Sequence, residues 1–83
     1  MKFYVYILKS LKDNRFYTGL TIDWKRRLKE HNIGKINTRS TLNRGPFKLI
    51  HLEECENRTI ARKREKFWKS GIGRELRDEM IDD

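Results

Sequence analysis

The strongest constraint on the fold is an unbroken apolar and aromatic run near the N-terminus, from Phe3 to Leu8. Successive side chains of a strand point to opposite faces, so this run is apolar on both faces and needs cover on both. It is therefore predicted to be the inner strand of a sheet that carries helices. A second run, Phe16 to Leu20, follows the turn-forming residues 12–15, and the two runs are expected to form an antiparallel hairpin.

Capping residues and breakers locate the rest of the chain. Thr21 or Asp23 can cap a first helix, Asn57 can cap a second, and Ser70 with Gly71 is expected to stop the second. The predicted elements are a helix over 24–31, an exposed loop over 32–46, a strand over 47–52, a helix over 58–69 and a final helix over 74–81. The order is β-β-α-β-α-α, an α+β fold with a three-stranded antiparallel sheet flanked by helices.

The chain is short and strongly basic. Its 83 residues leave room for one core, so a single domain is predicted over residues 1–83. Twenty Lys and Arg against twelve Asp and Glu give a net charge of +8, and a polyanion such as nucleic acid is the expected partner. A basic surface that serves only solubility is the alternative.

The positive charge is concentrated in residues 24–48 and 58–69. These segments are expected to contact phosphate backbones, with an affinity that falls as salt rises. Residues 75–83 carry five acids and one base, so this tail is predicted to lie away from the nucleic acid. The side chains predicted to bind nucleic acid are Lys25, Arg26, Lys29, Lys35, Arg39, Arg44, Lys63 and Lys66.

The single cysteine, Cys55, cannot form an internal disulfide, and one thiol is too few for a cysteine-based zinc site. A cytoplasmic location is therefore favoured. Only six apolar or aromatic residues lie between Lys2 and Lys9, which is far short of a membrane span. No membrane partner is expected.

The first predicted helix carries two polar side chains on its core-facing side. On a helical wheel, Arg27 and His31 fall on the same side as Trp24 and Leu28. His31 is either a hydrogen-bonded, half-buried imidazole or a reactive group. Arg27 either extends along the surface to reach solvent or acts in a site.

Glu65 is the only acid between Arg58 and Lys69, a segment that holds six bases. It is either a salt-bridge partner or a ligand for a hard divalent cation, which prefers carboxylate oxygen. Arg64 falls near the middle of the apolar side, where it either reaches solvent or pairs with Glu65.

The predicted hairpin places tyrosines together. Tyr4 and Tyr6 share one face of the first strand, while Tyr17 and Gly19 share one face of the second. Tyrosine is an ordinary core residue, so the pattern alone does not indicate a site. Gly19 removes a side chain at a point where another group can approach closely.

Taken in order and spacing, these residues resemble the GIY-YIG nuclease superfamily. The first motif is represented by Tyr4-Val5-Tyr6 and the second by Tyr17-Thr18-Gly19; Arg27 and His31 follow, and Ala61 to Glu65 matches a later Ala-x-x-x-Glu element. The resemblance covers residues 2–76 and is strongest to small stand-alone members related to the N-terminal nuclease domain of the excision-repair subunit UvrC. The sequence departs from the pattern at Tyr4, where the motif has glycine, at Thr18, and in having no Asn after Asn57.

The resemblance implies an endonuclease that hydrolyses DNA phosphodiester bonds with one divalent ion, Mg²⁺ or Mn²⁺, in DNA repair, recombination or processing. Selection by DNA structure rather than by sequence is expected. The catalytic residues that it implies are Tyr6, Tyr17, Arg27, His31 and Glu65. Glu65 would be the metal ligand, and Gly19 would keep the site open. The alternative is a catalytically weak nucleic-acid-binding module with the same fold.

Overall fold

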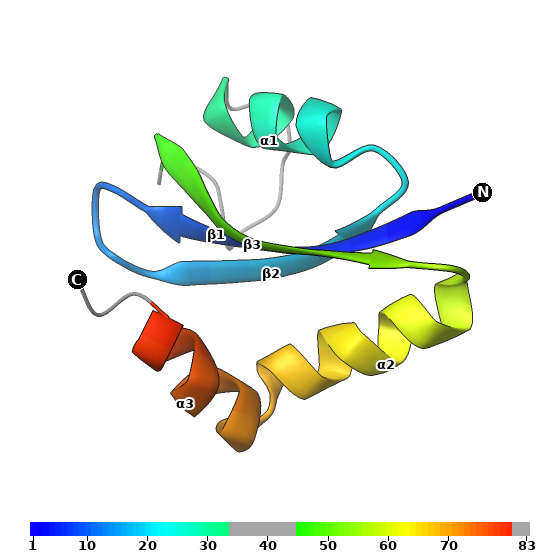
Figure 1. Cartoon of the computed structure of the whole chain (residues 1–83). Coiled ribbons are helices and arrows are strands. Elements are labelled where there is room, and N and C mark those ends of the chain that lie inside the picture. The colour runs from blue at the N-terminus through cyan, green and yellow to red at the C-terminus, as the bar shows by residue number, and fades with distance from the viewer. Residues whose placement is uncertain (34–44, 81–83) are drawn as a thin grey trace.

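The computed structural model describes residues 1–33 and 45–80, and it contains six elements. These are β1 (Phe3–Ser10), β2 (Phe16–Thr21), α1 (Trp24–Asn32), β3 (Phe47–Cys55), α2 (Arg58–Lys69) and α3 (Gly71–Met80). The antiparallel sheet has the strand order β2-β1-β3, with α1 on one face and α2 and α3 on the other (Figure 1). The predicted α+β fold and its element order are confirmed.

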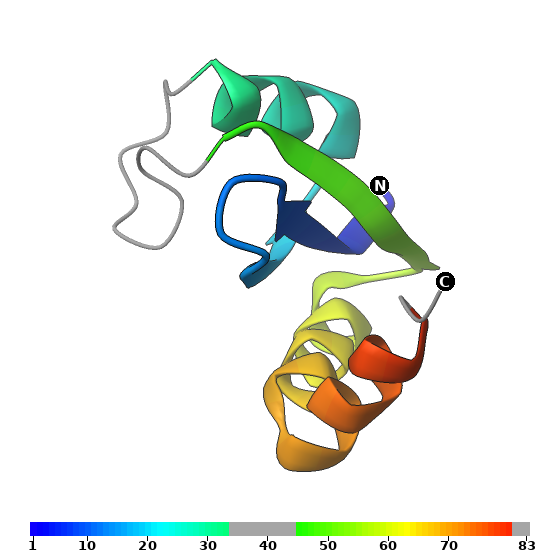
Figure 2. The same cartoon turned by 90° about the vertical axis from the view of Figure 1, so that its left-hand side faces the viewer.

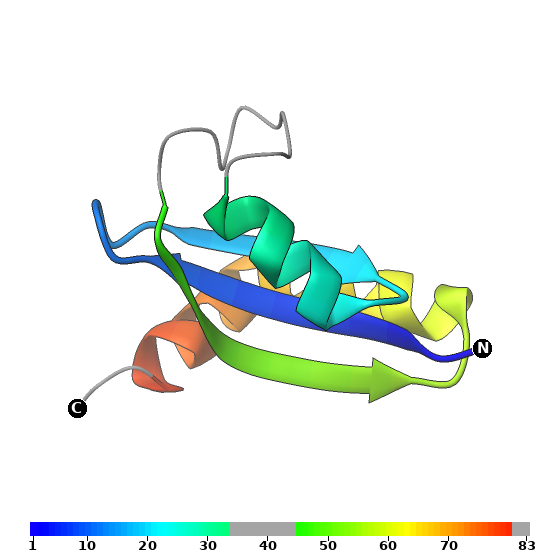
Figure 3. The ribbon, with the colours of Figure 1, turned by 90° about the horizontal axis from the view of Figure 1, so that it is seen from above.

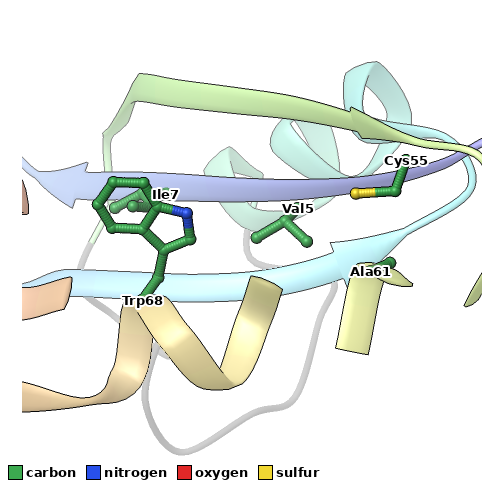
Figure 4. Packing of buried hydrophobic residues seen from close by; sticks show 5 residues of the cluster. All are labelled: Val5, Ile7, Cys55, Ala61 and Trp68. Carbon is green, nitrogen blue, oxygen red and sulfur yellow. The ribbon is translucent and has the colours of Figure 1, made fainter. Parts of the chain in front are cut away.

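Strand β1 is central because it is apolar on both faces. Val5 and Ile7 point toward α2, Tyr6 and Leu8 point toward α1, and none of the four side chains is more than 2% exposed. Burial of one side chain of this kind contributes roughly 1.5–3 kcal/mol, so β1 anchors both layers. Between the sheet and α2, Cys55, Ala61 and Trp68 complete the buried cluster that Val5 and Ile7 begin (Figure 4).

Helix α1 is fixed to the sheet at both ends. Asp23 caps it, because its Oδ1 accepts a hydrogen bond from the Arg26 N–H at 3.1 Å, while Thr21 accepts one from the Asp23 N–H instead. At the other end, Asn32 Oδ1 accepts a hydrogen bond from the Phe47 N–H at 2.6 Å. The helix therefore lies across the sheet in one orientation (Figure 3).

Several predicted boundaries differ from the structure: β1 ends at Ser10, β2 at Thr21 and α1 at Asn32, each one or two residues later than predicted. Strand β3 continues beyond residue 52 to Cys55, since Glu53 and Glu54 pair with β1. Helix α3 begins at Gly71 rather than at residue 74, because Ser70 Oγ accepts a hydrogen bond from the Gly73 N–H and so caps the new helix. The turn between α2 and α3 is consequently tight (Figure 2).

Parts of two predicted segments lie outside the described residues. These parts are residues 34–44 of the predicted loop and residue 81 of the predicted final helix. In the described ranges, no helix is both long enough and apolar enough to cross a bilayer.

A bidentate ion pair joins β3 to α2. Arg64 Nε and Nη2 donate to the two carboxylate oxygens of Glu53 at 2.9 and 2.7 Å, and His51 Nε2 lies 3.1 Å from the same carboxylate. Arg64 therefore pairs with Glu53, so the predicted pairing with Glu65 is wrong. The hydrogen bonds from Arg64 lower the pKa of Glu53 to about 2, although burial opposes this shift.

This ion pair predicts a pH-dependent stability. The folded-state pKa of Glu53 is depressed, so its contribution is complete above its ordinary pKa of 4.5 and is lost as the pH falls toward about 2. We expect Glu53→Gln to lower the free energy of unfolding by about 2 kcal/mol at pH 7, and the difference from the parent to shrink at pH 3. Urea denaturation at both pH values measures this.

The exposed Glu75→Gln is the matched control, because it removes the same charge without breaking this pair. Equal stabilities for Glu53→Gln and Glu75→Gln at pH 7 would show that the ion pair does not stabilise the fold.

Gly19 and Tyr6 are direct cross-strand partners, and the ring of Tyr6 covers the glycine. A Cβ on Gly19 would lie 2.5 Å from Tyr6 Cζ and would overlap the hydroxyl. Because Tyr6 is only 2% exposed, its ring has little room to move. We therefore expect Gly19→Ala to cost about 1–3 kcal/mol in urea denaturation.

Gly71→Ala is the control for this substitution, because a Cβ at Gly71 would meet nothing within 4 Å. It is expected to change the free energy of unfolding by less than about 0.5 kcal/mol. A Gly19→Ala variant as stable as Gly71→Ala would mean that Tyr6 is not held against the glycine.

Candidate active site

The structure brings three predicted site residues together on the α1 face of the sheet. Tyr6 comes from β1, Tyr17 from β2 and His31 from the last turn of α1. The His31 ring centroid lies 5.0 Å from that of Tyr17 and 6.1 Å from that of Tyr6, and the two tyrosine rings are 6.2 Å apart. We call these three residues the tyrosine–histidine cluster.

His31 is the most deeply buried residue of α1, with 3% of its surface exposed. The wheel placed it correctly on the core side, although Trp24 and Leu28 are less buried than it is. Its Nε2 lies 3.3 Å from the Tyr6 hydroxyl, whereas its Nδ1 has no hydrogen-bond partner among the described residues. Burial and the nearby Arg27 charge lower its pKa below 6.5, so the imidazole is neutral at pH 7.

The Tyr6 hydroxyl keeps its proton. Burial raises its pKa strongly and the neighbouring Tyr17 adds to this, while the Arg27 guanidinium opposes it. In the tautomer that carries its hydrogen on Nε2, the neutral His31 ring donates to the Tyr6 hydroxyl oxygen and keeps the lone pair of Nδ1 free. Tyr6 is therefore suited to orient the imidazole and not to act as a base.

Arg27 lies at the solvent rim of the cluster. Its side chain is 35% exposed, and its charge acts on the pKa of both Tyr6 and His31, which places the guanidinium beside them. The Glu30 carboxylate is 3.8 Å away, one turn along the helix, and such an exposed pair contributes little. Arg27 thus retains hydrogen-bond donors for an anion that arrives from solvent.

Glu65 is not part of this cluster. It lies on α2, on the opposite face of the sheet from α1 (Figure 1), and accepts a hydrogen bond from Lys69 Nζ at 3.3 Å. At about 100° per residue, Arg64 lies roughly 60° to one side of Ala61 and Glu65 roughly 40° to the other. Because Arg64 reaches β3, Glu65 lies on the flank of α2 that faces the β2 edge.

The donor set for a metal is small. The described ranges contain no group of three or more His, Cys, Asp or Glu side chains that could enclose an ion. Glu65 supplies a single carboxylate, about a quarter exposed. Mg²⁺ is commonly held by one or two carboxylates together with waters and substrate phosphates, so the chemistry of Glu65 fits an ion that is shared with a substrate.

The basic residues predicted to bind nucleic acid occupy both helical layers. Lys25, Arg26 and Lys29 are exposed on α1, and Lys63 and Lys66 are exposed on α2. The other three predicted residues, Lys35, Arg39 and Arg44, lie outside the described part of the chain.

The structure brings together three cations that the sequence did not assign to one site. Lys69, Arg74 and Arg77 line a pocket between β2, α2 and α3. Lys69 belongs to a segment predicted to contact phosphate, whereas Arg77 lies in the acidic tail that was predicted to lie away from the nucleic acid. The one signal for Arg77 was that it is the only base among residues 75–83.

Comparison with known proteins agrees with this arrangement. The family model of the GIY-YIG catalytic domain matches residues 2–76. A UPF0213 protein of Syntrophus aciditrophicus is 45% identical over 64 residues, which is 77% of this chain and 72% of the relative. A UPF0213 protein of Listeria welshimeri is 40% identical over 78 residues, or 94% of this chain and 83% of the relative.

A solved structure is also similar. The solution NMR structure of a UPF0213 protein from Bacillus halodurans has a TM-score of 0.57 and 36% sequence identity, covering 98% of this chain and 86% of that one. The motif tyrosines, the glycine beneath one of them and the helix that carries Arg27 all fall within the matched residues. This chain belongs to the GIY-YIG family.

Proposed function

We propose that the protein is a metal-dependent endonuclease that hydrolyses DNA phosphodiester bonds. The observation that carries this proposal is the half-exposed guanidinium of Arg27 beside the buried tyrosine–histidine cluster. Membership of a nuclease superfamily supports the same chemistry. The net charge of +8 favours a polyanionic substrate.

Arg27 is the group suited to stabilise the transition state. A phosphodiester under attack gains negative charge on its oxygens, and a guanidinium can donate two aligned hydrogen bonds to them. Its place beside the tyrosine–histidine cluster, with 35% of the side chain exposed, would let its donors reach a phosphate that arrives from solvent.

His31 and Tyr17 are suited to act on the attacking water. The lowered pKa of His31 keeps an imidazole nitrogen available to accept a proton at neutral pH. The Tyr17 ring packs against this imidazole at 5.0 Å, so its hydroxyl is available to orient the water. Tyr6 would hold the ring of His31 in place through the 3.3 Å contact with Nε2.

Glu65 would hold the divalent ion, Mg²⁺ or Mn²⁺. When bound, the ion would supply charge neutralisation at the leaving oxygen. The hydrogen bond from Lys69 would have to open for the carboxylate to bind an ion, and this exposed pair is weak.

We further propose that the substrate is DNA selected by its structure, in repair, recombination or processing. The described elements include no zinc-binding cluster and carry basic side chains on both layers, which favours contact with backbones over base reading. The cytoplasm, predicted from the single cysteine, remains the proposed compartment.

A catalytically weak nucleic-acid-binding module is the second candidate. The observation in its favour is that Arg27 and Glu65 belong to helices on opposite faces of the sheet. Both candidates bind nucleic acid in a salt-dependent manner, so cleavage must separate them.

A cleavage panel tests the proposal. Purified protein is incubated with branched, flapped, single-stranded and duplex DNA, and with RNA, in Mg²⁺, Mn²⁺ or EDTA. We expect metal-dependent nicking of at least one DNA structure. Arg27→Ala and Glu65→Gln should each lower the rate at least about 100-fold, because each removes a group that acts in the transition state.

Arg15→Ala is the matched control, because it removes the same charge from an exposed position between β1 and β2, outside both basic segments. It should retain the parent rate within a few-fold. Cleavage by Arg27→Ala at the rate of Arg15→Ala, or no nicking of any substrate by the parent, would leave the binding module as the function.

The pH profile of cleavage tests His31. Its lowered pKa means that it becomes protonated only when the pH falls below 6.5, so the rate should stay level from pH 8 to 6.5 and decline below that range. The His31→Gln variant should cleave more slowly than the parent, and its cleavage rate should no longer decline below pH 6.5. Rates from pH 5 to 8 under single-turnover conditions measure this, and an unchanged decline in His31→Gln would assign the titration to another group.

A further inference from the structure

A pocket of about 270 Å³ lies between β2, α2 and α3, on the face of the sheet opposite α1. Its lining residues are Phe16, Tyr17, Thr18, Trp68, Lys69, Arg74 and Arg77. We propose that this pocket binds a phosphate group of the nucleic-acid strand at a position beside the candidate active site. The choice of ligand rests on the proposed function.

The charge of the pocket favours an anion. Three of its lining residues, Lys69, Arg74 and Arg77, are cations, and none of the acidic side chains within residues 1–33 and 45–80 lines it. Carboxylates outside the pocket neutralise two of them in part: Glu65 pairs with Lys69, and Asp78 pairs with Arg77. Arg74 is exposed and has no ion pair within the described ranges, so its guanidinium is available to a ligand.

Arg77 is held in place before any ligand arrives. Its guanidinium carbon lies 4.0 Å from the centroid of the Phe16 ring, and its side chain is only 16% exposed. Its Nε and Nη2 donate to Asp78 at 3.3 and 3.2 Å. A guanidinium stacked on an aromatic face loses little freedom when it binds, which lowers the entropic cost of holding a phosphate.

Thr18 gives a second indication. It occupies the middle position of the second motif, and strand alternation turns its side chain toward α2, away from the tyrosine–histidine cluster. It is 8% exposed and lines the pocket, so it brings a hydroxyl group to a nearly buried wall. Hydroxyl groups are common partners of backbone phosphates.

The size of the pocket limits the ligand. Pockets that enclose drug-sized molecules measure about 300–1,000 Å³, and this one is slightly smaller. A phosphate with part of its sugar fits this volume better than a complete nucleotide does. The ligand is therefore one unit of a strand whose neighbouring units lie outside.

The pocket adjoins the candidate site at two points. Tyr17 lines the pocket and also packs against His31, while Lys69 lines the pocket and binds Glu65. The first point lies on β2, an edge strand of the sheet, and the second lies on α2. A strand that passes this edge would place one phosphate in the pocket and an adjacent one near the candidate site.

Binding of a fluorescent single-stranded oligonucleotide in EDTA tests the inference without cleavage. Anisotropy titrations at several salt concentrations compare the parent with Arg74→Gln, an exposed position at which folding should be retained. We expect affinity to fall about tenfold and the slope of log K against log salt to fall by about one, as for the loss of one phosphate contact. Arg77→Gln, checked for folding by circular dichroism, should behave alike.

Lys2→Gln is the control, because it removes one charge from an exposed position outside both basic segments and outside the pocket lining. It should change the affinity less than about twofold. Oligonucleotides with and without a 5′-phosphate identify the source of the phosphate: a loss with both assigns the pocket to the strand backbone, and a loss only with the phosphorylated strand assigns it to a strand end. An Arg74→Gln affinity equal to that of Lys2→Gln on both strands would overturn the inference.

The two proposals fail separately. A parent protein that cuts no substrate, while Arg74→Gln still loses affinity, would remove the nuclease and leave the pocket. A parent that cuts, while Arg74→Gln binds and cuts as the parent does, would remove the pocket and leave the nuclease.

Discussion

The close contact between Tyr6 and Gly19 is the interaction on which the candidate site depends. The Tyr6 ring fills the space that a side chain at position 19 of β2 would otherwise occupy, and this contact fixes the position of the Tyr6 hydroxyl. His31 then meets that hydroxyl from α1, and Tyr17 also packs against the imidazole. One missing side chain thus allows two strands and a helix to bring polar groups together in a buried place.

Local patterns predicted the fold well, because its main elements are determined by local sequence. The apolar run at β1 identified the central strand, and Asp23 and Asn57 cap the helices that they were expected to cap. The end of β3 and the partner of Arg64 were not predicted. Both depend on Glu53 meeting a helix that begins several residues later, and no local pattern indicates which side chain will lie opposite another across two packed layers.

The candidate site was predictable only within each element. A helical wheel placed Arg27 and His31 on one side of α1. Strand alternation assigned Tyr6 and Tyr17 each to one face of its own strand, and in the structure both faces lie on the same side of the sheet. Neither method indicates which face of the sheet a helix will cover. The layer that carries Glu65 was therefore not predictable, and Arg77 was not assigned to a site because its segment, residues 75–83, is acidic.

The arrangement of the two layers makes β2 the meeting point for the proposed chemistry. A sheet separates groups on its two faces everywhere except at its edges. The edge strand β2 carries Tyr17, and Glu65 lies on the flank of α2 that faces this edge. If Arg27 and Glu65 act on one phosphodiester, the linkage has to sit where side chains from both faces can reach around that edge. The cationic pocket lies at the same edge, so a strand held there by one phosphate would present the next to both layers.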